Sequence, residues 1–241
     1  MERVENSLKF SIAADVFEKL PELCIGVVYA KGINSPNSSL EIDTLLEKSL
    51  EQVVNKFQHH KVKDERAIQP YRQAFIQLGI NPNKFLSSIE AMATRIEKKK
   101  GLPKINPIVD LGNAISLKYL VPLGAHDVDR SEGDICIRFS NSNDYFIPFG
   151  EVAAEMLEAG ELIYSVGNKV KTRRWIWRQS EAGKVMEDST NVFFPIDGFK
   201  GHNDQLVLAA RDELASSLQQ LFACEVFVGL VDKENSEIVL P

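Results

Sequence analysis

The chain has 241 residues, of which 44% are hydrophobic and 26% are charged, and its formal net charge is −6 at pH 7. This composition is typical of a globular protein. It excludes a strongly basic nucleic-acid-binding chain, so any contact with nucleic acid has to use a local basic patch.

Targeting and metal-binding signals are missing from the sequence. MERVENSLKF at the N-terminus lacks the apolar core of a signal peptide, and no apolar run approaches the length of a membrane span. The three cysteines, Cys24, Cys136 and Cys224, lie in strand-like runs without a CxxC pair. We therefore expect reduced thiols, a cytoplasmic location and no membrane partner. The four histidines lack metal-ligand spacing, so we expect no metal and no cofactor.

The first hundred residues predict one buried strand and three helices. CIGVVYA at residues 24–30 is continuous and apolar, as in a buried strand. Residues 32–39 predict a loop and residues 61–66 a solvated linker. The helices are expected at residues 40–59, 71–79 and 87–99, the last opened by a capping box of Ser87 and Glu90.

A basic cluster ends the last of these helices. Lys98, Lys99 and Lys100 are consecutive. They fit two roles: a solvated tail that interacts favourably with the helix dipole, or a contact to phosphate groups.

Residues 103–129, PKINPIVDLGNAISLKYLVPLGAHDVD, organise the chain. Prolines lie at the start of this segment, and apolar residues then recur with the spacing of a helix, which predicts a buried helix. Asp110, Asn113 and Ser116 lie inside this helix and need partners if buried. The segment is either one wall of a polar pocket or an internal hydrogen-bond network that fixes the turn after the helix.

The second half of the chain is rich in predicted strands. These are expected at residues 134–139, 145–148, 161–166, 172–179, 191–196, 224–231 and 238–240. A helical turn is expected at 152–157 and a long amphipathic helix at 203–222. Helices and strands mix without strict alternation, which favours an α+β fold with mixed β-sheets and flanking helices.

TRRWIWRQ at residues 172–179 also has two interpretations. As one strand, it would place Trp175 and Trp177 on the same face, beside Arg173, Arg174 and Arg178. Such a face could stack on bases and hold phosphates. Alternatively, the tryptophans pack in the core and the arginines point to solvent.

Together these stretches resemble the B3/B4 domain of the bacterial phenylalanyl-tRNA synthetase β subunit, and most of all the stand-alone B3/4-domain proteins. The resemblance rests on INPIVDLGNAIS, VPLGAHDVDRSEGDICIRF, GELIYSV and EAGKVMEDSTNV, in that order, across residues 102–194. It implies a single B3/4-type domain over residues 1–241. An N-terminal α/β part of about residues 1–100 would pack against the motif-bearing part, residues 101–241.

The family's domain binds the acceptor end of mischarged tRNA and hydrolyses the aminoacyl ester. The resemblance assigns the pocket asparagine to Asn113, the pocket proline to Pro122 and the glutamate that reads a tyrosine hydroxyl to Glu181. Two positions depart from the family pattern: a threonine is replaced by Gly112 and a histidine by Gly124.

His126, two residues after the family's histidine position, is the candidate proton acceptor, since an unperturbed imidazole has a pKa of about 6.5. Its alternative role is to hold the turn by pairing with Asp127 or Asp129.

The resemblance also implies a partner, tRNA or aminoacyl-tRNA. We expect RNA contacts at six residues: Lys98, Lys99, Lys100, Arg173, Arg174 and Trp175. The expected function is hydrolysis of a mischarged aminoacyl-tRNA in trans; the alternatives are a non-catalytic tRNA- or amino-acid-binding module and a protein-interaction domain. We also expect residues 103–129 and 173–191 to meet at one cleft.

Overall fold

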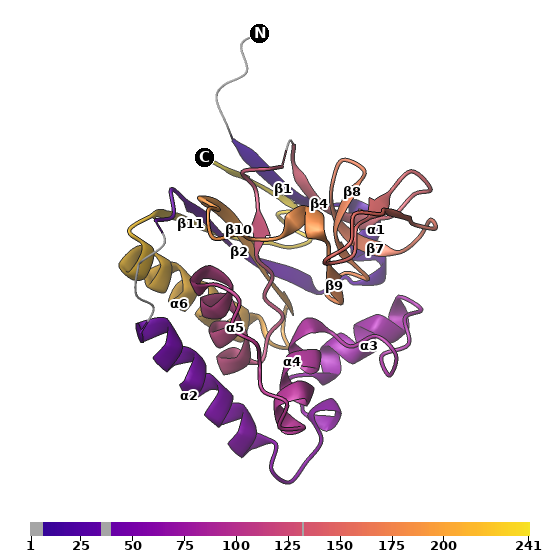
Figure 1. Cartoon of the computed structure of the whole chain (residues 1–241). Coiled ribbons are helices and arrows are strands. Elements are labelled where there is room, and N and C mark those ends of the chain that lie inside the picture. Colours follow the sequence, from indigo (N-terminus) through magenta and orange to yellow (C-terminus); the bar gives the residue numbers. More distant parts are fainter. Residues whose placement is uncertain (1–6, 35–39, 132) are drawn as a thin grey trace.

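Two β-sheets and six α-helices form the fold in the computed structural model, which describes residues 7–34, 40–131 and 133–241. Figure 1 shows the sheets together in the upper half of the molecule, with the helices α2 to α6 below them. The α+β class and the mixed sheet expected from the sequence are confirmed. No helix in the described ranges is long and apolar enough to cross a membrane.

The larger sheet has eight strands in the order β12-β1-β4-β7-β8-β5-β6, with β9 paired to β8. It mixes parallel pairs, β1 with β4 and β5 with β8, with antiparallel ones. Its strands are β1 (Leu8–Ile12), β4 (Ile135–Phe139), β5 (Tyr145–Phe146), β6 (Glu155–Met156), β7 (Leu162–Val166), β8 (Lys169–Arg173), β9 (Arg178–Gln179) and β12 (Glu237–Leu240).

The smaller sheet is antiparallel, in the order β11-β2-β10-β3. Its two central strands are buried over nearly their whole length, which explains their continuous apolar sequences. The strands are β2 (Leu23–Lys31), β3 (His126–Asp127), β10 (Asn191–Phe199) and β11 (Glu225–Val231).

The helices α2 to α6 lie on one side of the sheets, whereas α1 lies beside β4 of the larger sheet (Figure 1). The helix α6 packs on the smaller sheet, α5 packs on α6, and α2 packs on α5 (Figure 1). Their bounds are α1 (Ala14–Lys19), α2 (Leu40–Lys56), α3 (Gln69–Gln77), α4 (Ser88–Glu97), α5 (Pro107–Tyr119) and α6 (Asp204–Phe222).

Two glycines let α6 approach the smaller sheet closely. A Cβ atom on Gly26 of β2 would lie 2.8 Å from Val207 of α6, and one on Gly198 of β10 would lie 2.3 Å from the same side chain. Both distances are too short for real Cβ contacts, so the helix packs tightly only because these strand positions are glycine. This packing fixes β10, the strand that carries Asp197.

Most predicted elements are present, and three local predictions are wrong. Residues 172–179 form a hairpin, β8-turn-β9, rather than one strand. Residues 155–156 of the expected helical turn form strand β6. The expected linker at 61–66 contains a 3₁₀ turn (Val62–Asp64) with Val62 buried. Within the predicted loop at 32–39, residues 35–39 lie outside the described residues.

The first hundred residues share both sheets with the rest of the chain. Strand β1 lies between β12 and β4, and β2 lies between β11 and β10. The N-terminal part therefore supplies inner strands to both sheets.

Candidate functional site

A cavity of about 370 Å³ opens where residues 103–129 meet residues 179–185. We call it the outer cavity. Its polar lining consists of Asn113, Gln179 and Lys184, and the exposed apolar side chains of Ile105 and Phe149 also line it. The prediction that the two motif-bearing segments meet at one cleft is confirmed.

The helix α5 presents Asn113 to this cavity. The Asn106 side chain caps the helix by accepting a hydrogen bond from Val109 N, and Pro107 occupies the first turn. Asp110 accepts from Ile105 N at 3.1 Å, and burial raises the pKa of its carboxyl. Asp110 therefore belongs to an internal network, as one of the two interpretations had it.

The other two polar residues of α5 differ from each other. Ser116 donates to Val121 O at 2.6 Å and fixes the turn after the helix. Asn113 is half-buried and lines the outer cavity, and its amide makes no hydrogen bond to the residues that the structure describes. Asn113 is thus the polar group of α5 that remains available to a ligand.

The turn after α5 is held against β10. Pro122 O accepts a hydrogen bond from Asp197 N at 3.0 Å, and Gly124 N donates to Pro195 O at 2.9 Å. The Gly124 N–H is therefore already engaged and is not available to stabilise an oxyanion. Gly112 lies inside α5, where a Cβ atom would lie 3.2 Å from Leu123.

A second, smaller cavity of about 90 Å³ adjoins the first; both are lined by Ser88, Leu123, Gly124 and Gln179. We call it the inner cavity. Its lining includes the aromatic side chains of Tyr164, Trp175 and Trp177, together with His126 and Asp197. The two cavities together form one site with two chambers.

Asp197 is the buried carboxyl of the inner cavity and is only 2% exposed. Its Oδ1 accepts hydrogen bonds from the Tyr164 hydroxyl at 2.7 Å and from Trp175 Nε1 at 2.6 Å. Its Oδ2 accepts none from the described residues, and it keeps some accessible surface. Burial raises the pKa of this carboxyl to about 7, against the lowering effect of the Tyr164 and Trp175 hydrogen bonds.

Behind Asp197, a third donor fixes the backbone. The Tyr71 hydroxyl from α3 donates to Asp197 O at 2.9 Å and accepts from Asn203 Nδ2 at 2.7 Å. The rings of Tyr71, Phe75 and Phe199 pack on Trp175. The floor of the inner cavity is thus built from four elements that are far apart in sequence.

His126 is 2% exposed and makes no hydrogen bond to the described residues. Its Nδ1 is the one fully buried side-chain nitrogen or oxygen there that lacks a partner. Burial, followed by the nearby charge of Lys171, lowers its pKa to about 3. The imidazole is therefore neutral near pH 7, and the premise that it titrates near pH 6.5 does not hold.

The alternative in which His126 pairs with an aspartate is also wrong. Asp127 accepts from Ser189 and Arg130, both at 2.6 Å, and Asp129 accepts from Asn191 and Thr190. The ring nitrogens of His126 point toward two glycines instead. A Cβ atom on Gly124 would lie 3.3 Å from Nε2, and one on Gly183 would lie 3.2 Å from Nδ1.

Glu181 lines neither cavity. Its carboxylate accepts from Gly150 N at 3.1 Å and pairs with Lys184 Nζ at 3.1 Å, and these contacts lower its pKa, the Gly150 bond most. It therefore holds two parts of the outer rim, the turn beside Phe149 and the side chain of Lys184. Its role in reading a substrate hydroxyl stays a prediction, and that role would require it to leave these partners.

The expected RNA-binding surface around the tryptophans is largely engaged internally. Trp175 is fully buried, so the expectation that it stacks on a base is wrong. Arg173 pairs with Glu161 and Glu155, both at 2.9 Å. Arg174 lies over the ring of Phe85, 4.0 Å from its centroid, and near Glu161.

The lysine cluster, in contrast, is on the surface. Lys98, Lys99 and Lys100 are all exposed at the C-terminal end of α4. The N-terminal end of the same helix supplies Ser88 to both cavities and Met92 to the outer one. Because ten helical residues rise about 15 Å, the lysines lie within about that distance of the site.

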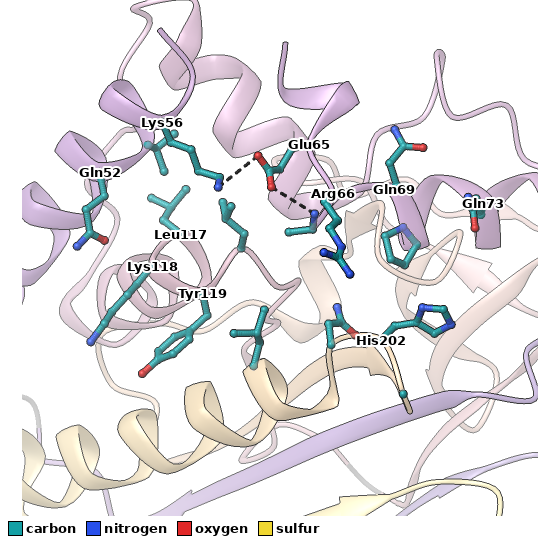
Figure 2. A pocket seen from close by; sticks show the side chains of 17 residues that line it. Gln52, Lys56, Glu65, Arg66, Gln69, Gln73, Leu117, Lys118, Tyr119 and His202 are labelled. Carbon is teal, nitrogen blue, oxygen red and sulfur yellow. Dashed lines mark hydrogen bonds and ion pairs between the residues drawn. The ribbon is translucent and has the colours of Figure 1, made fainter. Parts of the chain in front are cut away.

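A larger hollow of about 740 Å³ lies at the other end of α5, lined by Leu117 to Leu120 and by residues of α2 and α3. Figure 2 shows Lys56 paired with Glu65 there, at 3.3 Å, and Lys118 pairs with Glu213 at 2.6 Å. It contains none of the predicted site residues. Among the side chains that the structure describes, no group of three or more His, Cys, Asp or Glu could hold a metal ion.

Sequence reasoning missed three residues of this site: Asp197, Tyr164 and Gln179. Gln179 donates to Ala125 O at 2.6 Å and to Gly183 O at 2.9 Å, and it bridges the two chambers. The signal that could have found Asp197 is a single carboxylate within the apolar run NVFFPIDGF, since a charge in a buried strand needs a reason.

Comparison with protein families defines the class. The B3/4 domain family model matches residues 70–222, well over half of the chain, so the chain belongs to the B3/4 domain family.

The most similar relatives found include two phenylalanine–tRNA ligase beta subunits. The one from Colwellia psychrerythraea (strain 34H) is 29% identical over 115 residues, which are 48% of this chain and 14% of that protein. The one from Fusobacterium nucleatum subsp. nucleatum is 32% identical over 94 residues, which are 39% of this chain and 11% of that protein. The chain thus matches only a small part of the length of these relatives.

A solved structure shows the same fold. It is an N-terminal fragment of the phenylalanyl-tRNA synthetase beta subunit from Pyrococcus horikoshii, with a TM-score of 0.50 and 12% identity. The match covers 100% of this chain and 56% of that one.

Proposed function

We propose that this protein binds the acceptor end of an aminoacyl-tRNA at the two adjoining cavities and hydrolyses the ester of a mischarged amino acid in trans. The observation that carries the proposal is Asn113, which lines the outer cavity and whose amide makes no hydrogen bond to the described residues. Its membership in the B3/4 family and its similarity to tRNA ligase subunits support tRNA as the partner.

Hydrolysis of the aminoacyl ester needs few groups from the protein. Water adds to the ester carbonyl, the bond to the ribose oxygen breaks, and that oxygen takes the proton that the water loses. Asn113 Nδ2 donates a hydrogen bond to the carbonyl oxygen as negative charge develops on it. The walls of the cavities hold the ester in one orientation, which lowers the entropic part of the barrier.

His126 contributes as a neutral hydrogen-bond acceptor. With a pKa of about 3 the ring is not protonated to imidazolium near pH 7, so one ring nitrogen carries a hydrogen and the other accepts. Its Nε2 lies beside Gly124, which lines both chambers. From there it orients the attacking water or the bound aminoacyl group.

The tRNA approaches along α4. Lys98, Lys99 and Lys100 contact phosphate groups at one end of this helix, while the acceptor end enters the outer cavity at the other. Ile105 and Phe149, 56% and 44% exposed, flank that entrance and can pack against the terminal nucleoside.

A binding module without chemistry is the second candidate. Two observations favour it: the Gly124 N–H is already bonded to Pro195 O, and with a pKa of about 3 His126 is a weak base near neutral pH. In that case the protein would bind the same acceptor end and leave the ester intact.

Deacylation of a panel of correctly charged and mischarged aminoacyl-tRNAs tests the proposal. We expect at least one mischarged substrate to be hydrolysed, and Asn113→Ala to slow this by about 10²-fold, the usual effect of losing one oxyanion donor. Asn143→Ala, in an exposed turn, is the matched control and should leave the rate unchanged.

The outcome separates the candidates. Tight tRNA binding without ester cleavage would support the binding module. An Asn113→Ala rate equal to the wild-type rate would remove Asn113 from the chemistry, and absence of tRNA binding would reject both candidates.

A further inference from the structure

The inner cavity presents hydrogen-bond acceptors and aromatic side chains. Its buried polar groups are Oδ2 of Asp197, which accepts no hydrogen bond from the described residues, and the ring of His126. Asp197 has two neighbouring hydrogen-bond donors, Tyr164 and Trp175, and both donate to Oδ1. A ligand that enters therefore meets a free carboxylate oxygen at the floor.

Among the residues that the structure describes, no cation forms an ion pair with this carboxyl. Its pKa is set by burial and by the Tyr164 and Trp175 hydrogen bonds, with no cation among the causes. Lys171, whose charge acts on His126, is engaged elsewhere: its Nζ donates to Ser131 Oγ at 2.6 Å and to Ala182 O at 2.7 Å. Arg178 is exposed at the lip, over the ring of Trp177. A buried carboxylate without a partner is costly, so a cation that enters would be bound strongly.

We propose that the inner cavity binds a primary ammonium group, with Asp197 as its counter-ion. Oδ2 accepts one ammonium N–H, and the nearly fully buried side chains of Trp175 and Tyr164 close the cavity around it. The volume of about 90 Å³ holds about three non-hydrogen atoms, because a water molecule takes about 30 Å³ of liquid. An ammonium group with its last methylene groups fits this space.

A hydroxyl group fits the same position less well. It can donate to Oδ2, but it leaves the charge of the carboxylate uncompensated in a buried site. The structure therefore favours an ammonium group over a hydroxyl group.

The inference deepens the proposed function, because it rests on the two cavities holding one aminoacyl group. The ammonium is either the α-amino group of that aminoacyl ester or the end of its side chain. The α-ammonium and the side-chain ammonium share one chemistry, and methyl esters of four different six-carbon acids distinguish them.

Four methyl esters form the test set. Norleucine methyl ester carries only the α-ammonium, methyl ε-aminocaproate only the terminal ammonium, methyl ε-hydroxycaproate a terminal hydroxyl, and methyl caproate neither. Binding is measured by calorimetry. The titration of the Asp197 carboxyl carbon is followed by NMR with each ester at saturation.

We expect one of the two ammonium esters to bind at least tenfold more tightly than methyl caproate and the hydroxyl ester. By linkage, that ester should lower the pKa of Asp197 by at least one unit. Asp197→Asn keeps an acceptor for Tyr164 and Trp175 and should abolish the preference. Asp188→Asn, at an exposed ion pair with Arg130, removes the same charge and should leave the preference intact.

Tyr164→Phe gives a second route if Asp197→Asn does not fold. It removes a donor that favours the ionised carboxyl, so it should raise the pKa of Asp197 and weaken the ammonium preference. Equal binding of all four esters, or a preference that survives Asp197→Asn, would overturn the inference.

The binding and NMR measurements use no tRNA and do not depend on ester cleavage. Failure of the deacylation assay therefore leaves the ammonium site standing. Equal binding of the four esters would leave the deacylase proposal standing.

Discussion

The inner and outer cavities adjoin, yet the carboxyl of Asp197 in the first and the amide of Asn113 in the second are held in opposite ways. In the inner cavity, Asp197 is fixed by Tyr164, Trp175 and a backbone contact to Tyr71. In the outer cavity, the Asn113 amide makes no hydrogen bond to the described residues, and Lys184 is held by a single exposed ion pair.

This difference indicates a division of roles. A carboxyl with two fixed donors keeps one orientation and can discriminate between ligand groups. A free amide on the rigid helix α5 can turn to follow the charge that develops on a reacting carbonyl. The inner cavity should therefore govern which group is accepted, and the outer cavity what happens to it.

The largest effect that the comparison predicts is on stability at Trp175. Trp175→Ala should lower the free energy of unfolding by about 3–5 kcal/mol, because it leaves a void among Tyr71, Phe75 and Phe199 and removes a donor to Asp197. Phe149→Ala, at the rim of the outer cavity and 44% exposed, should cost less than about 1 kcal/mol. Urea unfolding of both variants measures the contrast. Similar losses at the two positions would contradict the assignment of the rigid region to the inner cavity.

The next effect is the pH dependence of stability at Asp197. Folding raises the pKa of this carboxyl from 3.8 to about 7, so the unfolded chain binds fewer protons in that range, and stability falls as pH rises from about 4 to 7. Asp197→Asn removes this penalty. At pH 8 the variant should be more stable than the wild type by up to about 4 kcal/mol, while at pH 4 the two should be equal.

His126 contributes a pH dependence of stability with the opposite sign. Folding lowers its pKa to about 3, so stability falls as pH drops from about 6.5 to 3. In the wild type the two slopes nearly cancel between about pH 4 and 6.5, and Asp197→Asn should expose the histidine slope of about 1.4 kcal/mol per pH unit. Unfolding curves at several pH values test both signs. A wild type and variant with parallel pH profiles would show that Asp197 ionises as it does in water.

The sequence was enough to place the helix beside the outer cavity. The prolines and helical periodicity of residues 103–120 predict α5, and the resemblance to the B3/B4 domain assigns Asn113 to a pocket. Interpretation of the residues alone left open whether Asp110, Asn113 and Ser116 line a pocket or form a network. The structure shows that both occur, since two of them hold the chain and one faces the cavity.

The inner cavity could not be predicted, for two physical reasons. Arg174 and Trp175 adopt left-handed backbone conformations, with φ of 45° and 59°, although neither is Gly, Asn or Asp. The hairpin that buries Trp175 therefore has no turn signal in TRRWIWRQ. Strand β10 continues through Pro195 to Phe199, whereas the pattern predicts its end at Ile196, one residue before Asp197.

The smallest effect on stability, and a distinct effect on binding, is expected at the lysine cluster. Replacing Lys98, Lys99 and Lys100 together by alanine removes three exposed charges that lie at a helix end, away from both cavities. The free energy of unfolding should change by less than about 0.5 kcal/mol, as for most surface substitutions. If each lysine neutralises one phosphate, the slope of log affinity for tRNA against log salt should become shallower by about 2–3. The matched control replaces Lys19, Lys48 and Lys233, which are equally exposed but lie elsewhere, and should shift affinity without changing the slope by that amount. Filter binding at several salt concentrations measures both variants. Equal slopes for the two triple variants would mean that the net charge, and not the surface at the end of α4, governs the contact with tRNA.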